Sequence, residues 1–268
     1  MPALSETKGA ATVVRSIKDI APEAVMLAGA GRSILLQLAN PAIGHGVARH
    51  SSFAVDPLKR LHGTLSYIYA LTNGTSQQRA TMVAQVHRAH RPVKSSGSDS
   101  PQAYDAQDAA LQLWVAATLY DSGMQVYNRI FPALTAQAAE SLYLEYGVLG
   151  TALGMPAKLW PATMVDFRKY WDGQLAQLRV DETTCEAAME LLAARSAPLW
   201  IRAAMPLARF LTAGLLPPEV RAMFQLPWSP ARERCLNLGF AALAALVKIL
   251  PRRIRHAPMH YYLKRIPG

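Results

Sequence analysis

The sequence contains few cysteines, no recognisable leader segment and no long uninterrupted hydrophobic run. Its two cysteines, Cys185 and Cys235, form neither a CxxC pair nor any spacing typical of a metal site. We therefore expect both thiols to be free and buried, in a reducing compartment such as the cytoplasm. The opening residues, MPALSETKGA, lack the apolar core of a signal peptide. The run from Leu238 to Leu250 is too short, and too interrupted by Lys248, to span a bilayer.

Alternating Val, Ile and Thr residues bounded by turn residues are nearly absent, whereas runs rich in Ala and Leu dominate. This pattern argues against sheets and favours helices. Hydrophobic residues make up 51% of the chain, and no composition shift or Pro/Gly/Ser-rich linker divides it. We therefore predict an all-α fold, a single multi-helix domain over residues 1–268. Residues 1–22 are expected to be a lightly ordered lead-in, and residues 251–268 a basic C-terminal tail.

Acidic residues are also scarce relative to basic ones. The chain has 28 Lys and Arg against 18 Asp and Glu, a formal net charge of +10. The basic residues gather in the last third and are not interleaved with aromatic residues as on a nucleic-acid platform, so no nucleic-acid partner is expected. The densest cluster is the tail, PRRIRHAPMHYYLKRIPG. Two interpretations of it stay open, a solvated terminal face packed on the core and a contact with a membrane surface.

The signatures of several enzyme classes are missing. The chain has no GxSxG elbow, HExxH motif, Walker A loop or dinucleotide fingerprint after a strand, and it lacks the paired ExxH motifs of di-iron bundles. The GAG at residues 29–31 has no preceding strand and lacks the Lys and Ser/Thr of a phosphate loop. We interpret its glycines as a close helix contact or a bend.

One histidine stands out because it lies on the apolar side of a well-delimited helix. Thr75 or Ser76 can cap the start of this helix, and Pro92 ends it. Val83, Val86 and His90 then share one face, with His87 one turn before His90. Such an imidazole is either a metal or heme ligand or a core histidine with satisfied hydrogen bonds. The spacing alone leaves both interpretations open.

A second helix, predicted over residues 57–69, places Arg60 and Thr64 four residues apart on one face. An arginine with a hydroxyl one turn away can anchor a heme propionate or donate hydrogen bonds to bound oxygen. The same spacing is found in ordinary surface pairs.

Five segments together resemble one known family. In chain order they are LLQLANPAIGHGVARHSSF, DPLKRLHGTLSYI, VHRAH, YDAQDAALQLWVAATL and LLPPEVRAMFQLPW. They resemble the catalytic domain shared by MpaB-type oxygenases and rubber oxygenases, the latex clearing proteins, from about Ala28 to the C-terminus. The resemblance implies an all-helical fold, one heme b bound through a single proximal histidine, and the use of dioxygen. It also implies a hydrophobic, isoprenoid-like substrate.

Carried over position by position, the resemblance assigns four residues to the site. His90 takes the position of the iron ligand, and His87 stands where latex clearing protein has an arginine. Arg60 and Thr64 match the arginine and threonine of the distal-side motif. The resemblance thus gives Arg60 and Thr64 either a catalytic role, hydrogen bonding to iron-bound oxygen, or a role in holding a propionate.

Three further positions depart from the family pattern. Gly63 stands where the rubber oxygenases have a distal lysine, so the resemblance does not specify a sixth heme ligand. Asn40 and Ala116 stand where many members have histidines, which weakens the inference about the reaction more than the inference about the fold. His45 and His50 are candidates for supporting the site, and we do not expect either to bind iron.

The predicted function is therefore a heme-dependent oxygenase that uses dioxygen to oxidise or cleave a C=C bond of an isoprenoid-like substrate. A non-catalytic heme- or lipid-binding helical protein at membrane surfaces is the alternative. An apolar helical scaffold without a cofactor is a third. The expected location is the cytoplasm, either free or peripheral at a membrane, and no pattern specifies an oligomeric state.

Overall fold

A computed structural model describes residue 14 and residues 16–49, 57–95 and 104–267, without the side chains of residues 57–60. Within these residues the fold is all-helical, as predicted, and an isolated bridge between Lys94 and Asp105 is the only β pairing. The helices are α1 (Ile17–Ile20), α2 (Ala30–Leu38), α3 (Pro41–Arg49), α5 (Pro57–Asn73), α6 (Ser76–His90), α7 (Ala109–Ile130), α8 (Ala136–Tyr146), α9 (Val148–Thr151), α10 (Met164–Gln177), α11 (Glu182–Ala193), α12 (Leu199–Leu215), α13 (Pro218–Met223), α14 (Pro230–Ile249), α15 (Arg252–Arg255) and α16 (Ala257–Leu263). Two 3-10 turns, η1 (Ala24–Gly29) and η3 (Ala157–Leu159), complete the described elements.

The starts of several helices follow from local capping. The Thr75 hydroxyl accepts a hydrogen bond from the Gln78 backbone N–H, and the Gln78 side chain accepts one from the Thr75 N–H, a complete capping box for α6. Asp108 caps α7 by accepting from the N–H groups of Ala110 and Leu111. Of the two caps proposed for α6, Thr75 and Ser76, Thr75 is thus the one used.

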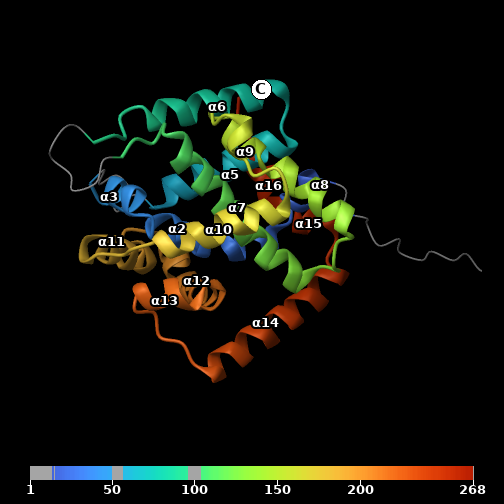
Figure 1. The fold of residues 1–268 in the computed structure, drawn as a ribbon. Helices are drawn as coiled ribbons and strands as arrows, with labels where there is room; N and C mark the ends of the chain where they lie inside the picture. The colour runs from blue at the N-terminus through green and yellow to red at the C-terminus, as the bar shows by residue number, and fades with distance from the viewer. Residues whose placement is uncertain (1–13, 15, 50–56, 96–103, 268) are drawn as a thin grey trace, which may run out of the picture.

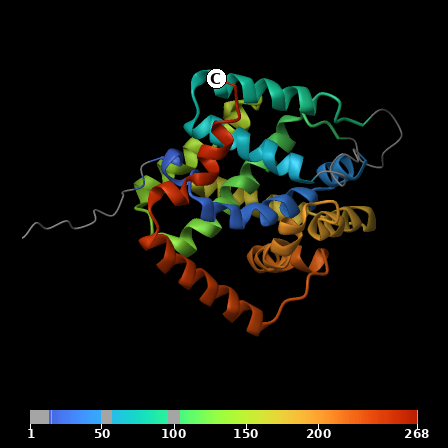
Figure 2. The same ribbon diagram turned by 180° about the vertical axis from the view of Figure 1, so that it is seen from behind.

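The long helix α7 runs through the middle of the molecule (Figure 1). Trp114 on α7 is fully buried, and its indole N–H donates to the Leu36 carbonyl of α2 over 3.1 Å. Helices α5 and α6 lie on one side of α7, and α12 and α14 lie on the other, an arrangement that the reverse view also shows (Figures 1 and 2). In the described part of the chain, the hydrophobic core consists of one large cluster and two small ones.

Two expectations about the chain ends need correction or refinement. Part of the predicted lead-in is helical, because α1 buries Ile17 and Ile20 against the core, while residues 1–13 and 15 lie outside the described part. The tail forms α15 and α16. Tyr262 of α16 is buried, and its ring lies 5.8 Å from that of Tyr69 on α5, so this part of the tail packs on the core. No helix in the described ranges is both long and apolar enough to cross a bilayer.

The sequence also led to predictions for the glycines of GAG and for the two cysteines. A Cβ on Gly29 would lie 2.9 Å from the Ser122 carbonyl oxygen of α7, and one on Gly31 would overlap Thr212 of α12, so the close helix contact is confirmed. The cysteines are free, as predicted. Cys185 is only half-buried, however, and Cys235 is exposed because it faces outward from α14.

Candidate functional site

An apolar cavity of about 110 Å³ lies between α2, α5 and α7. On the α5 side it is lined by Leu61, Leu65 and Ile68, and by Thr64. These positions recur at helical spacing, so one face of α5 forms a wall of the cavity. The predicted site helix therefore does border a cavity.

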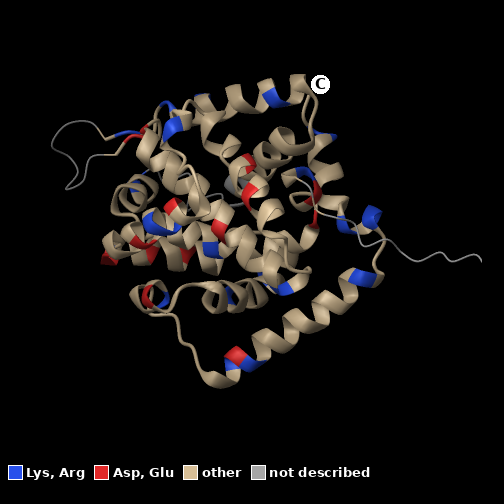
Figure 3. Cartoon of the chain, turned by 45° about the vertical axis from the view of Figure 1, so that its right-hand side comes forward, with Lys and Arg blue, Asp and Glu red and all other residues tan. Residues whose placement is uncertain are grey.

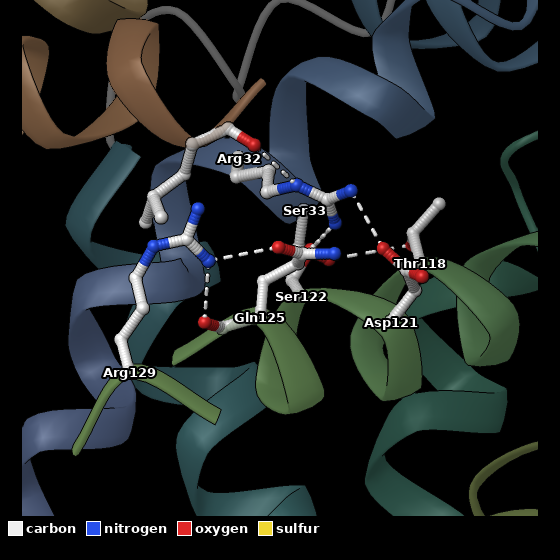
Figure 4. A network of polar contacts seen from close by, with 8 residues as sticks. Arg32, Ser33, Thr118, Asp121, Ser122, Gln125 and Arg129 are labelled. Atoms are coloured by element: carbon white, nitrogen blue, oxygen red, sulfur yellow. Dashed lines mark hydrogen bonds and ion pairs between the residues drawn. The ribbon is translucent and has the colours of Figure 1, made fainter. Parts of the chain in front are cut away.

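The opposite wall contains a small buried hydrogen-bond network between α2 and α7. The Gln37 side-chain amide donates to the hydroxyls of Ser33 and Thr118, over 3.0 Å in each case. Ser33 and Gln37 also line the cavity, and Ser33 lies 3.3 Å from the Thr118 hydroxyl (Figure 4). The network thus presents fixed polar atoms at one side of an otherwise apolar space.

Behind this wall a buried ion pair joins the same two helices. Arg32 Nη2 lies 2.6 Å from Asp121 Oδ2, Nη1 donates to the Ser122 hydroxyl over 2.8 Å, and Nε donates to the Leu215 carbonyl over 2.8 Å (Figure 4). Burial lowers the pKa of Arg32 from its ordinary value, and the charge of Asp121 acts in the opposite direction. Ser122 lines the cavity, so Arg32 contacts the cavity lining through its hydrogen bond to this hydroxyl.

Among the residues that the structure describes, the lining of the cavity contains no charged side chain. Its described residues are apolar, small or neutral polar, and its two phenols are protonated. Burial raises the pKa of Tyr69 to about 12, with a smaller contribution from Tyr262, and burial likewise raises the pKa of Tyr146. An uncharged, mostly apolar space of this kind suits a hydrocarbon better than a polar metabolite.

The four predicted site residues are not all placed at this cavity. Thr64 lines it, whereas His87 and His90 are half-buried in the last turn of α6 and outside the lining. The backbone of Arg60 belongs to α5, but its side chain lies outside the described part. The assignment of these four residues to one heme site therefore stays a prediction.

His45 and His50 were the histidines proposed to support the site. His45 Nε2 lies 2.7 Å from Asp181 Oδ2, which caps α11, so His45 joins α3 to α11 and does not line the cavity. His50 lies outside the described residues.

Sequence reasoning missed the polar wall and the ion pair behind it. Arg32, Ser33 and Gln37 interrupt the apolar run of α2, with Ser33 and Gln37 one turn apart, and Asp121 and Ser122 interrupt that of α7. Polar residues within two helices that are otherwise apolar are a signal of a buried network, because each must find a partner. That signal was available in the sequence.

The cavity itself does not fit a porphyrin. Its volume is about 110 Å³, below the ~300 Å³ at which sites for larger ligands begin. The described residues of its lining include no imidazole or thiolate that could bind iron axially. In addition, the described residues contain no group of three or more His, Cys, Asp or Glu that would hold a metal ion.

Comparisons with known proteins give the family. The chain is 35% identical over 226 residues to the uncharacterized proteins Mb2261 of Mycobacterium bovis and Rv2237 of Mycobacterium tuberculosis, an alignment covering 82% of this chain and 88% of each relative. Its fold matches that of latex clearing protein LCP in the closed state, with a TM-score of 0.56 and 19% identity over 94% of this chain and 72% of that one. The model of the family described as "ER-bound oxygenase mpaB/B'/Rubber oxygenase, catalytic domain" matches residues 17–249, so the chain belongs to this family of oxygenase catalytic domains.

Proposed function

We propose that the protein is a dioxygen-dependent oxygenase that oxidises or cleaves a C=C bond in a hydrophobic, isoprenoid-like substrate. The observation that carries the proposal is the uncharged apolar cavity along the Thr64 face of α5, in a chain that belongs to an oxygenase family. The cavity would hold the apolar part of the substrate, and Thr64, Ser33 and Gln37 would orient it.

The size of the cavity supports a small hydrocarbon segment. At about 110 Å³ it is somewhat smaller than an apolar cavity of ~150 Å³ that accepts benzene. A branched segment of about five carbons, the repeating unit of isoprenoids, matches such a volume. Longer substrates would extend beyond the cavity, so this space would select a segment of the chain and exclude water from it.

The proposed cofactor is heme b, which the resemblance implies and which supplies dioxygen activation when it is bound. Because the cavity does not fit a porphyrin, the heme would bind elsewhere, at the end of α6. His90 would be the iron ligand, its imidazole half-buried on the side of Val83 and Val86, which pack against the core. His87 would flank it, and Arg60 and Thr64 would lie on the distal side.

An absorption spectrum tests the cofactor. Protein purified with an ample heme supply is expected to show a Soret band, and His90→Ala to lose it. The matched control is His260→Ala, which removes an exposed imidazole from α16 and is expected to keep the band. Equal heme content in wild type and His90→Ala would overturn the ligand assignment.

Turnover tests the reaction and the cavity separately. Reduced protein given dioxygen and an unsaturated terpenoid is expected to form carbonyl products. Ile34→Trp fills the cavity and is expected to lower turnover at least tenfold, since lost positioning alone costs about that much or more. Leu144→Trp adds the same indole on α8, outside the lining, and is expected to leave turnover unchanged. Product formation that is insensitive to Ile34→Trp would remove the cavity from the proposal.

One observation favours the alternative, a non-catalytic heme- or lipid-binding protein. The two positions where many members of the family have histidines serve structural purposes here. Asn40 Oδ1 accepts from the N–H groups of Ala42 and Ile43 at the start of α3, and the Ala116 methyl lies against Gly150. A protein that shows the Soret band but forms no product with any unsaturated terpenoid would fit this alternative.

A further inference from the structure

Helix α14 is apolar on two opposite sides, and only one of them is covered. Leu236, Phe240 and Val247 pack inward against α7 and α12. On the other side, six residues at helical spacing form what we call the outer stripe: Cys235, Leu238, Ala242, Ala245, Leu246 and Ile249. A helix that is apolar on both sides is normally buried.

The outer stripe faces solvent along an edge of the molecule. Leu238 is 71% exposed and Ile249 is 78% exposed, and a Cβ on Gly239 would meet nothing within 4 Å. Both ribbon views show α14 as the outermost helix of this side, with no other element beyond it (Figures 1 and 2). A contiguous exposed apolar stripe of this length marks an interaction surface.

The charges at the two ends of the stripe have the same sign. Arg232 and Arg234 are exposed at the start of α14, and Lys248, Arg252 and Arg253 are exposed at and just beyond its end. The acidic residue of α14, Glu233, accepts a hydrogen bond from the Trp228 indole over 2.8 Å. Between the two ends the helix surface is uncharged (Figure 3).

This charge distribution distinguishes between two possible partners of the outer stripe, a second copy of the chain and a membrane surface. Pairing with a second copy of the same stripe would bring one basic end against another in either direction, which costs free energy. An anionic bilayer surface attracts both ends while its hydrocarbon accepts the leucine and isoleucine side chains. We propose that the outer stripe of α14 docks the protein peripherally on membranes that contain anionic phospholipid.

The proposed surface overlaps only in part with the one suggested by the sequence. It includes Arg252 and Arg253 of the C-terminal tail. Tyr262 of the tail is instead used in packing, because Tyr262 and Met259 of α16 form a buried cluster with Tyr69 of α5. Docking through α14 also does not depend on the proposed cofactor or reaction, since neither His90 nor the cavity lining contributes to the outer stripe.

Vesicle co-sedimentation tests the proposal. The full chain is expected to bind phosphatidylcholine vesicles that contain phosphatidylserine, in a salt-sensitive way, and to bind vesicles of phosphatidylcholine alone at least about tenfold more weakly. Leu238→Ser/Ile249→Ser is expected to reduce binding by about tenfold or more. The control Val165→Ser changes a side chain of α10 that is 66% exposed, and it is expected to bind like wild type.

A probe on Cys235, which belongs to the outer stripe, reports whether this side of α14 contacts the lipid. In a Cys185→Ala background, an environment-sensitive fluorophore on Cys235 is expected to shift to the blue when the mixed vesicles are added. Circular dichroism establishes that each variant is folded. The proposal is overturned if the protein does not bind the mixed vesicles, if the double variant binds as well as Val165→Ser, or if the stripe instead mediates dimerisation that the double variant abolishes.

Discussion

Arg32 is a fully buried cation whose three donor groups all have acceptors. Its side chain is 3% exposed and joins Asp121, Ser122 and Leu215, from α7 and α12, to α2. Removing one member of a buried ion pair leaves the other charged and unpaired. We expect Arg32→Leu to lower the free energy of unfolding by about 3–5 kcal/mol, measured by urea denaturation followed by circular dichroism.

A matched variant separates the contribution of the ion pair to stability from the effect of removing an arginine side chain. Arg129 is half-buried on α7 and donates to the Gln125 carbonyl and side chain over 2.8 Å. Arg129→Leu is expected to lower the free energy of unfolding by less than half as much as Arg32→Leu. The double variant Arg32→Met/Asp121→Leu is expected to be more stable than Arg32→Leu, because it leaves no unpaired buried charge. A change below about 1 kcal/mol in Arg32→Leu would contradict the proposed role of the pair.

Protonation of Asp181 is expected to make stability depend on pH. Burial would raise the pKa of its carboxyl, but hydrogen bonds from Thr184 and the contact with His45 outweigh this and lower the pKa below its ordinary value of 3.8. A lowered folded-state pKa means stabilisation that is present above about pH 4 and is lost as the pH falls through the folded pKa.

The variant Asp181→Asn tests this at α11. Asparagine also caps helices well, and the carboxylate of Asp181 is half-exposed and screened by solvent. The free energy of unfolding at pH 7 is therefore expected to change by less than about 1 kcal/mol. The decrease in stability between about pH 5 and pH 3 is expected to be smaller than in wild type. Asp172→Asn removes an exposed carboxylate of α10 as the control. An unchanged pH profile in Asp181→Asn would disprove the linkage.

At the scale of the elements, Gly31 sets how closely α2 approaches α12. The atom nearest to a Cβ at this position is the Thr212 hydroxyl oxygen, within van der Waals overlap. Gly31→Ala is therefore expected to destabilise the protein by about 1–3 kcal/mol through overpacking. Gly173→Ala, on a helix position with nothing within 4 Å, is expected to stabilise it by about 0.5–1 kcal/mol, as alanine does inside helices.

The same pair of helices provides the check. Thr212→Ala removes the nearest atom, so Gly31→Ala is expected to cost less in that background than in wild type. Thermal unfolding of the four proteins measures this coupling. Equal costs in both backgrounds would show that the contact between Gly31 and Thr212 is not the source of the effect.

Helix limits were predictable from sequence where local chemistry sets them. The caps Thr75 and Thr135 and the first-turn Pro218 mark observed starts. The helical segment that starts after Thr135 is instead divided, with α8 ending before Gly147 and α9 beginning after it. A Cβ on Gly147 would lie 3.2 Å from the Trp160 ring, so a contact with a later segment, which no local pattern contains, sets this break.

For the molecule as a whole, the sequence predicted the fold class and the family. The wall on α5 follows from helical spacing, whereas the cavity needs α2 and α7 at their observed distance. The positions of Ser33, Gln37 and Ser122 around it result from packing between segments far apart in the chain. The placement of His90 relative to Arg60 and Thr64 depends in the same way on tertiary packing.

Cofactor binding provides a prediction for the whole molecule, because a ligand that binds only the folded state raises its stability. Heme at about 100 times its dissociation constant adds about 2.7 kcal/mol, which corresponds to a rise in Tm of roughly 5–10 °C for a domain of this size. We expect this rise in wild type and in His260→Ala, and little or none in His90→Ala, measured by differential scanning calorimetry of the protein with and without added heme. Because adventitious heme on an apolar surface would stabilise all three proteins alike, an equal rise in His90→Ala would argue against a specific site at this histidine.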